Sequence, residues 1–291
     1  MSTVYEIVTE KLLDKLEAGT VPWSKPWNAA SGAPRNVRGN LYRGINVFLL
    51  GCQSYSDPRW LTYKQATAMG GHVSRGSKST LVVFWNIVEK RDKDTGEKGK
   101  SAFLRYYNVF NVAQCEGLNL PSLEVPTVTH TPIEACEAIV RGFEGAPSIS
   151  HGSSGAWYRP SDDTVSMPDK ASFISPEYYY STLFHELSHS TGHASRLARE
   201  GVTNGARFSS HAYSREELVA EMSAAFLAGH AGIGERTIDN SAAYLASWIK
   251  VLKEDSKAAV WAAGRAQKAS ELILGMREAA AEPTGEERIA A

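Results

Sequence analysis

One short segment, FHELSHSTGHASRL (Phe184 to Leu197), constrains this chain of 291 residues more than any other. It places His185 and His189 four residues apart, and residues at that spacing lie on one face of an α-helix, one turn from each other. Their imidazoles can then share a metal ion. Glu186 is turned about 100° around the same helix, from where it can reach a water molecule bound to that ion. With only 8 His in the chain, about 0.02 such motifs are expected by chance. The segment therefore predicts a metal-binding helix with Glu186 as general base.

A zinc ion in a catalytic site has three protein ligands and one open position. His193 is too far along a straight helix to join His185 on one ion, because eight residues separate them. If Gly192 ends the helix, we expect His193 to cap it or to support a ligand from behind. Zn²⁺ is the ion that such donors usually hold, and Mn²⁺ or another divalent ion would also fit.

A second acidic helix, predicted over REELVAEM, carries Glu216, Glu217 and Glu221. Glu217 and Glu221 share one face because they lie four residues apart. This spacing resembles the gluzincin pattern, which implies that Glu217 is the third ligand and that Glu221 holds a ligand histidine by its other ring nitrogen. The reverse assignment and a solvated acidic helix face remain open. Tyr213 or His211, just before these acids, could stabilise an oxyanion, although surface roles are more common for such residues.

The hydrophobic pattern predicts an α+β protein of two domains. Residues 4–18 read as an amphipathic helix with a capping box at Thr3 and Glu6. Residues 79–88 and 101–112 read as strands that flank a charged turn. Three prolines within residues 117–132 indicate a boundary. We therefore expect an α+β domain over residues 1–118, a linker over 119–131, a mainly helical domain with a small sheet over 132–282, and a flexible tail over 283–291.

Charge is distributed unevenly along the chain. Residues 1–120 contain 16 Lys and Arg against 10 Asp and Glu, a net charge of +6, and the remainder has a net charge of −7. The basic part is also rich in aromatic residues, and such mixtures hold single-stranded nucleic acid by stacking on bases and pairing with phosphates. The alternative is that most of these aromatic residues belong to the core. The predicted DNA-binding residues are Trp23, Lys25, Trp27, Tyr42, Arg43, Trp60, Tyr63, Lys64, Arg75 and Lys78.

Other sequence features indicate a cytoplasmic protein that has no membrane partner. No run of 18 apolar residues and no signal peptide is visible. The three cysteines, Cys52, Cys115 and Cys136, are odd in number and widely spaced, which favours free thiols in a reducing compartment.

At these motifs the chain resembles the ArdC family of antirestriction proteins, which conjugative plasmids and other mobile elements carry. VPWSKPW, NLYRGINVFLL, WLTYKQATAMGGHVSRGSKST and YYNVFNVAQCEGL resemble the N-terminal domain of that family, and FHELSHSTGHASRL with EELVAEMSAAFL resembles its metallopeptidase domain. The resemblance covers nearly the whole chain. It implies a single-stranded-DNA-binding domain followed by a zincin-like peptidase domain, and a role in protecting incoming DNA from host restriction.

The substrate would be an unknown protein, which could itself be bound to DNA. The same N-terminal module resembles one in plasmid primases, so that half indicates DNA binding rather than antirestriction as such. Two alternatives remain open at this point. One is a DNA-binding protein whose metal only braces the fold, and the other is a protease of the Spartan type that acts on DNA–protein crosslinks.

Overall fold

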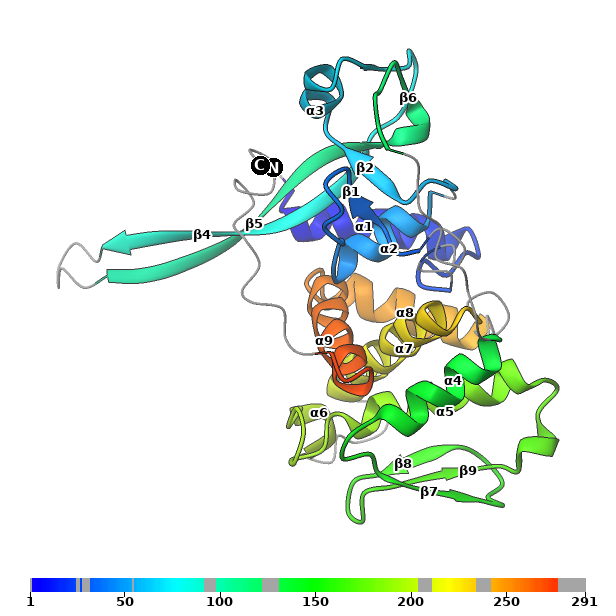
Figure 1. Ribbon diagram of the computed structural model, residues 1–291. Coiled ribbons are helices and arrows are strands. Elements are labelled where there is room, and N and C mark those ends of the chain that lie inside the picture. Colours follow the sequence, from blue (N-terminus) through cyan, green and yellow to red (C-terminus); the bar gives the residue numbers. More distant parts are fainter. Residues whose placement is uncertain are drawn as a thin grey trace.

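The computed structural model describes residues 2–24, 27, 32–53, 55–91, 98–121, 131–203, 211–233 and 242–276. Over these residues the protein is α+β, with a four-stranded sheet at one end, a small sheet at the other and a layer of helices between them (Figure 1). None of the described helices combines the length and the apolar composition that crossing a membrane requires. The three cysteines are free, as predicted.

The N-terminal half contains the larger sheet. Helix α1 (Val4–Glu17) begins at the predicted capping box of Thr3 and Glu6. The sheet has the strand order β1-β2-β5-β4, in which β1 is parallel to β2 and the other neighbours are antiparallel. Its strands are β1 (Arg35–Asn36), β2 (Arg59–Leu61), β4 (Thr80–Arg91) and β5 (Lys98–Asn111). Strands β4 and β5 are longer than the sequence predicted, and their hairpin projects from the body (Figure 1).

Short elements complete this half. They are α2 (Ile45–Gly51), α3 (Tyr63–Ala68), β3 (His72–Val73), the 3₁₀ helix η1 (Val112–Gln114) and β6 (Cys115–Glu116). Strand β3 pairs with β6 beside α3. The close approach of these two strands requires glycine at position 71, because a Cβ there would lie 2.6 Å from the backbone oxygen of Glu116.

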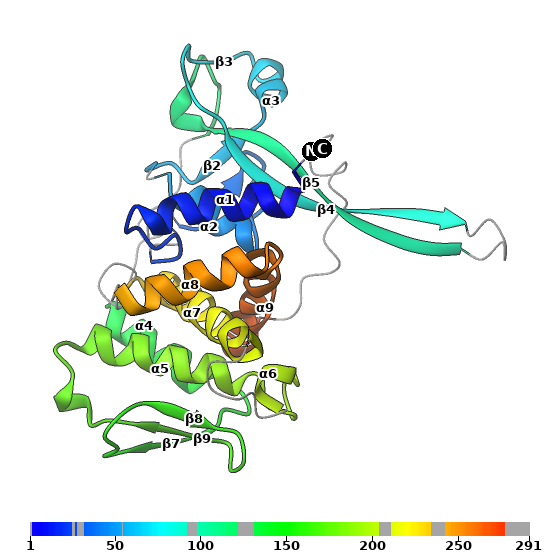
Figure 2. The same cartoon turned by 180° about the vertical axis from the view of Figure 1, so that it is seen from behind.

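The C-terminal half is mainly helical. Its elements are α4 (Pro132–Gly142), β7 (Ser148–His151), β8 (Trp157–Arg159), β9 (Thr164–Met167), η2 (Lys170–Ser172), α5 (Pro176–Ser190), α6 (Glu200–Thr203), α7 (His211–Ala231), α8 (Ala242–Glu254) and α9 (Ala258–Ile273). Strand β9 lies between β7, parallel to it, and β8, antiparallel to it. This sheet lies beyond α5 on the side away from the N-terminal half (Figure 2). Strand β7 was not predicted.

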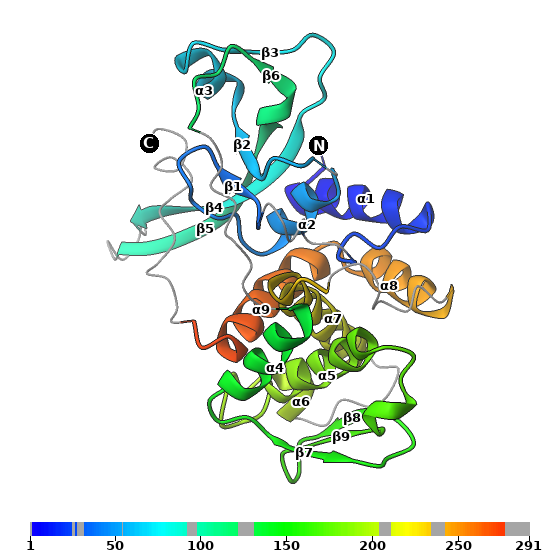
Figure 3. The same cartoon turned by 45° about the vertical axis from the view of Figure 1, so that its right-hand side comes forward.

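One hydrophobic core joins the two halves. Helices α1 and α2 and strands β4 and β5 bury apolar side chains against α7, α8 and α9. Figure 3 shows α1 and α2 above α7, α8 and α9. The rings of Phe48 and Phe226 stack at 4.7 Å, and those of Trp23 and Trp248 meet edge to face at 5.2 Å. Most of the predicted linker (residues 122–130) and the whole predicted tail (residues 283–291) lie outside the described residues.

Candidate metal centre

Helix α5 carries the two histidines towards α7. Its buried residues Tyr180, Leu183, Phe184 and Leu187 pack into a second core with β9 and α7, which fixes the rotation of the helix. His185 and His189 then stand one above the other, with their Nε2 atoms 3.1 Å apart and their rings nearly perpendicular. The two nitrogens therefore converge on one point, as the four-residue spacing predicted.

Glu217 of α7 completes the cluster. Its carboxylate oxygens lie 3.5 Å from Nε2 of His185 and 3.5 Å from Nε2 of His189. One donor atom from each of the three residues lies within 4.8 Å of the others. Ligand atoms held about 2.1 Å from a tetrahedral ion are about 3.4 Å apart, so both the donor types and their spacing fit a divalent metal ion.

Two further carboxylates of α7 lie behind the histidines. Glu221 Oε1 is 3.7 Å from Nδ1 of His185, and Glu216 Oε1 is 3.5 Å from Nδ1 of His189. Such contacts orient ligating imidazoles and raise their basicity. The geometry thus favours Glu217 as the ligand and Glu221 as the supporting residue, in the order that the gluzincin resemblance implied.

The sequence reasoning missed the role of Glu216. Arg199, from the segment after α5, holds its carboxylate at 2.6 Å, and both side chains are buried. The Arg199 guanidinium also donates to Thr191 Oγ1 and to the backbone oxygen of Ser188. The three acids of REELVAEM were visible as candidates, but no pattern in the sequence pairs Arg199 with Glu216.

The electrostatics of the cluster reflect several carboxylates around the imidazoles. Burial lowers the pKa of His185, but the hydrogen bond with Glu217 and the charges of Glu221 and Glu186 outweigh it and raise this pKa to about 10. Burial raises the pKa of Glu217, but the neighbouring histidines and a hydrogen bond from Tyr213 outweigh it and lower this pKa to about 2. Several carboxylates gathered around two imidazoles favour the binding of a cation.

The remaining predicted residues around the centre have different surroundings. Glu186 is buried and close enough to raise the pKa of His185. Tyr213 contacts Glu217, one turn away on α7, whereas the side chain of His211 lies outside the described part of the chain. His193 lies past the end of α5, and its Nδ1 bonds to Ser195 Oγ at 2.8 Å. The structure therefore does not place His193 behind a metal ligand, because the chain turns away after Gly192.

Several predicted DNA-binding residues are structural. Trp23, Tyr42 and Trp60 are buried, with 0%, 8% and 2% of their surface exposed, so their rings cannot stack on a base. Trp27 packs against Phe226. The prediction is corrected for these rings, because Trp23 and Trp27 pack in the core between the two halves, and Tyr42 and Trp60 pack in a separate core within the N-terminal half. Arg43 is engaged in an ion pair with Glu271 of α9 at 2.6 Å.

Other members of that set remain available for binding. Tyr63, Lys64, Arg75 and Lys78 are exposed on α3 and on the segment from β3 to β4. Lys25 lies outside the described residues. Three further aromatic residues, Trp85, Phe103 and Tyr106, are exposed on the β4–β5 hairpin. Successive residues of a strand point to opposite faces, and the sequence of these strands does not say which face is buried.

Fold and site together define a two-domain protein whose C-terminal domain is zincin-like. The family model described as a zincin-like metallopeptidase matches residues 134–265, and that of the N-terminal domain of anti-restriction factor ArdC matches residues 2–110. The chain belongs to the ArdC antirestriction family, as its motifs indicated. The crystal structure of the antirestriction protein ArdC of plasmid R388 is similar in its metal-free form, with a TM-score of 0.74, 36% identity, and 94% of this chain and 99% of that chain covered. The Mn(II)-bound form gives a TM-score of 0.74 and 35% identity, covering 94% and 98%.

Curated relatives are of two kinds. An uncharacterised protein of Sinorhizobium fredii, y4eC, is 34% identical over 91% of this chain and 89% of its own length. The DNA primase TraC of Escherichia coli is 38% identical over 94% of this chain, but the chain spans only 27% of that primase. The similarity to TraC thus concerns one segment of a longer protein.

Proposed function

We propose that this protein is an antirestriction protein that binds single-stranded DNA and holds a divalent ion at His185, His189 and Glu217 in a peptidase-type centre. The observation that carries the proposal is the convergence of these three donors in a member of the ArdC family. The Mn(II)-bound relative supports a divalent ion, and the donor set suits Zn²⁺ as well. The similarity to a DNA primase supports DNA as the partner.

Each residue of the centre has a chemical task in this proposal. The bound ion would supply Lewis acidity and lower the pKa of a water molecule. Glu186 would accept the proton of that water, and Glu221 and Glu216 would orient the two histidines. Tyr213, which is hydrogen-bonded to Glu217, would donate to a developing oxyanion.

An edge strand that packs on the metal-binding helix supports a protein substrate. Strand β8 ends the small sheet and packs on α5. An extended peptide can bind such an edge by strand addition. We therefore infer that the substrate is a protein, and DNA binding would bring the peptidase domain close to proteins that are themselves bound to DNA.

Metal analysis tests the site first. Purified wild type should contain close to one divalent ion per chain, and Glu217→Ala should lose it. Glu254→Ala, on an exposed residue of α8, is the matched control and should retain the ion. A Glu217→Ala protein with full metal content would remove the ligand assignment.

Restriction protection then separates catalysis from binding. Glu186→Gln should keep the ion and lose both proteolysis and protection of incoming DNA, because only the proton acceptor is removed. Full protection by this variant would instead favour a DNA-binding protein whose metal braces the fold. Cleavage of a crosslinked protein only when DNA is present would favour a crosslink protease.

A further inference from the structure

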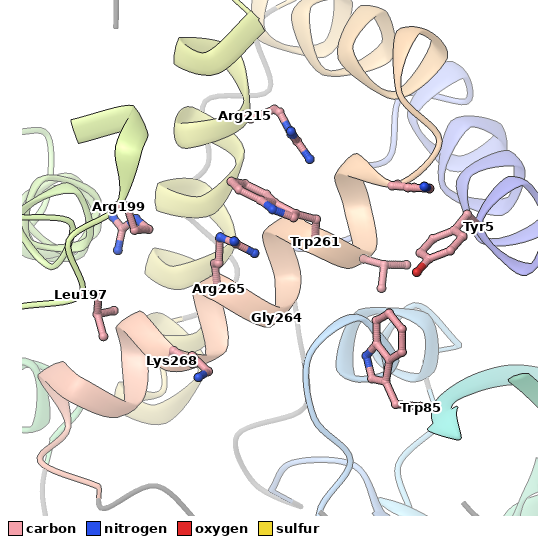
Figure 4. Close-up of a pocket in the computed structure, with 11 residues that line it drawn as sticks. Tyr5, Trp85, Leu197, Arg199, Arg215, Trp261, Gly264, Arg265 and Lys268 are labelled. Carbon is pink, nitrogen blue, oxygen red and sulfur yellow. The ribbon is translucent and has the colours of Figure 1, made fainter. Parts of the chain in front are cut away.

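A cavity of about 570 Å³ lies between the two halves of the molecule (Figure 4), and its lining does not include His185, His189 or Glu217. Helix α1 and strand β4 form one wall, and α7, α9 and the segment after α5 form the other. Its volume is in the range typical of small-molecule and cofactor sites. We refer to it as the interdomain cavity.

One face of α9 lines this cavity. Lys257, Trp261, Gly264, Arg265 and Lys268 follow one another at spacings of four, three, one and three residues, which places them along a single helical stripe. A Cβ added to Gly264 would meet no atom within 4 Å, so the helix surface is open at the middle of the stripe. A stripe of cations, an indole and a glycine differs from the alanine-rich opposite face, which is buried in the core.

The cations of the cavity are not equally engaged. Arg199 is held by Glu216, and Arg215 lies 3.3 Å from Asp255. Arg265 lies 3.9 Å over the ring of Trp261, and no carboxylate among the described residues forms an ion pair with it. Burial and the charges of Arg215 and Arg199 lower the pKa of Arg265, in keeping with an excess of positive charge. Such an excess calls for an anionic ligand.

Aromatic rings face the cavity from both halves. Trp85 of β4 is 47% exposed and lies edge-on to Tyr5 at 6.5 Å, while Trp261 stands on the opposite wall. Figure 4 shows Trp85 and Tyr5 on one side and Trp261, Arg215 and Arg265 on the other. A site for a free phosphate group would require only cations. Indole faces next to cations suit a ligand that carries both phosphates and unpaired bases.

We propose that the interdomain cavity binds a short stretch of single-stranded DNA, with phosphates at Arg265 and Lys268 and a base against Trp85. The inference rests on the proposed DNA binding and extends it, because the cations come from the C-terminal domain. The site is also connected to the metal centre. Arg199 lines the cavity and at the same time holds Glu216, which contacts His189.

The test is an oligonucleotide titration with fluorescence anisotropy at several salt concentrations. The double variant Arg265→Ala/Lys268→Ala should bind a labelled oligo(dT) more weakly, and the slope of log K against log[salt] should become smaller by about 1.4, that is about 0.7 for each lost phosphate contact. Trp85→Ala should weaken binding about 5- to 150-fold, the range expected when one stacked base is lost. Lys250→Ala, an exposed lysine of α8, is the matched control and should match wild type.

Two readouts keep the result interpretable. Each variant should retain the wild-type unfolding midpoint and bind Mn²⁺ as wild type does, since the altered side chains are exposed. If wild type binds oligo(dT) and the double variant binds it with the same affinity and slope, the cavity proposal is overturned while the proposed function stands. If wild type binds no oligonucleotide, both are overturned. An acidic peptide is titrated in the same way. If the double variant loses binding of this peptide but keeps that of oligo(dT), the cavity serves protein recognition and the DNA assignment is overturned.

Discussion

Three glutamates of α7 look alike in the sequence and differ in the folded protein. Glu217 has a pKa lowered to about 2 by its histidine neighbours, despite the opposing effect of burial. The pKa of Glu221 is raised, chiefly by burial. Glu216 is buried too, but His189 and Arg199 lower its pKa. Helical spacing predicted the face shared by Glu217 and Glu221. It could not distinguish ligand from supporting residue, because that depends on distances to another helix.

A comparison of Glu221→Gln with Glu217→Ala should separate these roles. Removing the Glu217 donor should abolish metal binding at micromolar ion concentrations. Glu221→Gln retains the three donors and only weakens the contact with His185, so the affinity should fall about 10- to 100-fold. Isothermal titration with Mn²⁺ measures both. Equal losses in the two variants would mean that Glu221 also binds the ion directly.

The buried ion pair of Arg199 and Glu216 permits a test by double substitution. Arg199→Met leaves the Glu216 carboxylate buried without its cation and should cost about 3–5 kcal/mol of unfolding free energy. Arg199→Met/Glu216→Leu removes both charges and should recover most of that stability. Because His189 then loses its Nδ1 partner, the metal affinity should stay low. Urea denaturation and metal titration of the same samples separate the two effects, and recovery of both would exclude an orienting role for Glu216.

At the scale of elements, the sequence predicted those that carry their own local signals. Helix α1 has a capping box at Thr3, and α4 has another at Thr131 with Pro132 at its first position. Strands β4 and β5 were visible from β-branched and aromatic residues. Helix α2 was not predicted, since its run INVFLLG is apolar on every side and shows no period. Strands β1, β3 and β6, of two residues each, exist only through their partners.

The turn between β8 and β9 fastens the end of α5. Asp163 accepts hydrogen bonds from Tyr158 and from Arg196, and the Arg196 guanidinium also reaches the backbone oxygen of Ser190. The hydrogen bonds from Arg196 lower the pKa of Asp163 against a smaller effect of desolvation. This carboxylate therefore stabilises the folded state above its unfolded pKa of about 3.9, and the contribution is lost as the pH falls through the lower folded pKa.

Asp163→Asn should accordingly lower stability at neutral pH. Because the Asp163 side chain is 31% exposed and therefore partly screened by solvent, we discount the pair to about 1 kcal/mol or less. The difference between wild type and variant should shrink as the pH falls below about 4, where the wild-type carboxylate takes up its proton. Chemical denaturation at pH 7, 5 and 3 measures the trend. Asp162→Asn, whose partner Arg159 is exposed, is the control and should show no comparable pH trend.

For the whole molecule, the joint core explains why Trp23 and Trp27 of the basic half were assigned to DNA by mistake. Trp23 packs on Trp248 and Phe48 on Phe226, and no sequence period links residues so far apart in the chain. The resemblance to a known family indicated two domains. It did not indicate that α1 and α2 lie against α8 and α9, with Thr9 bonded to the backbone of Ser256 and Gly44 to Gln267.

A shared core implies that the two halves unfold together. Phe226→Ala removes a ring that both halves contact and should destabilise the whole protein by about 3–5 kcal/mol. Denaturation followed by tryptophan fluorescence, which reports on Trp23 and Trp60 among others, and by bound Mn²⁺, which reports on the C-terminal half, should give one coincident transition in wild type and variant. Phe103→Ala, on an exposed ring of the hairpin, should leave the midpoint unchanged. Two separate transitions in the wild-type protein would mean that each half has a sufficient core of its own, and that the contacts between Phe48 and Phe226 contribute little to the stability of either.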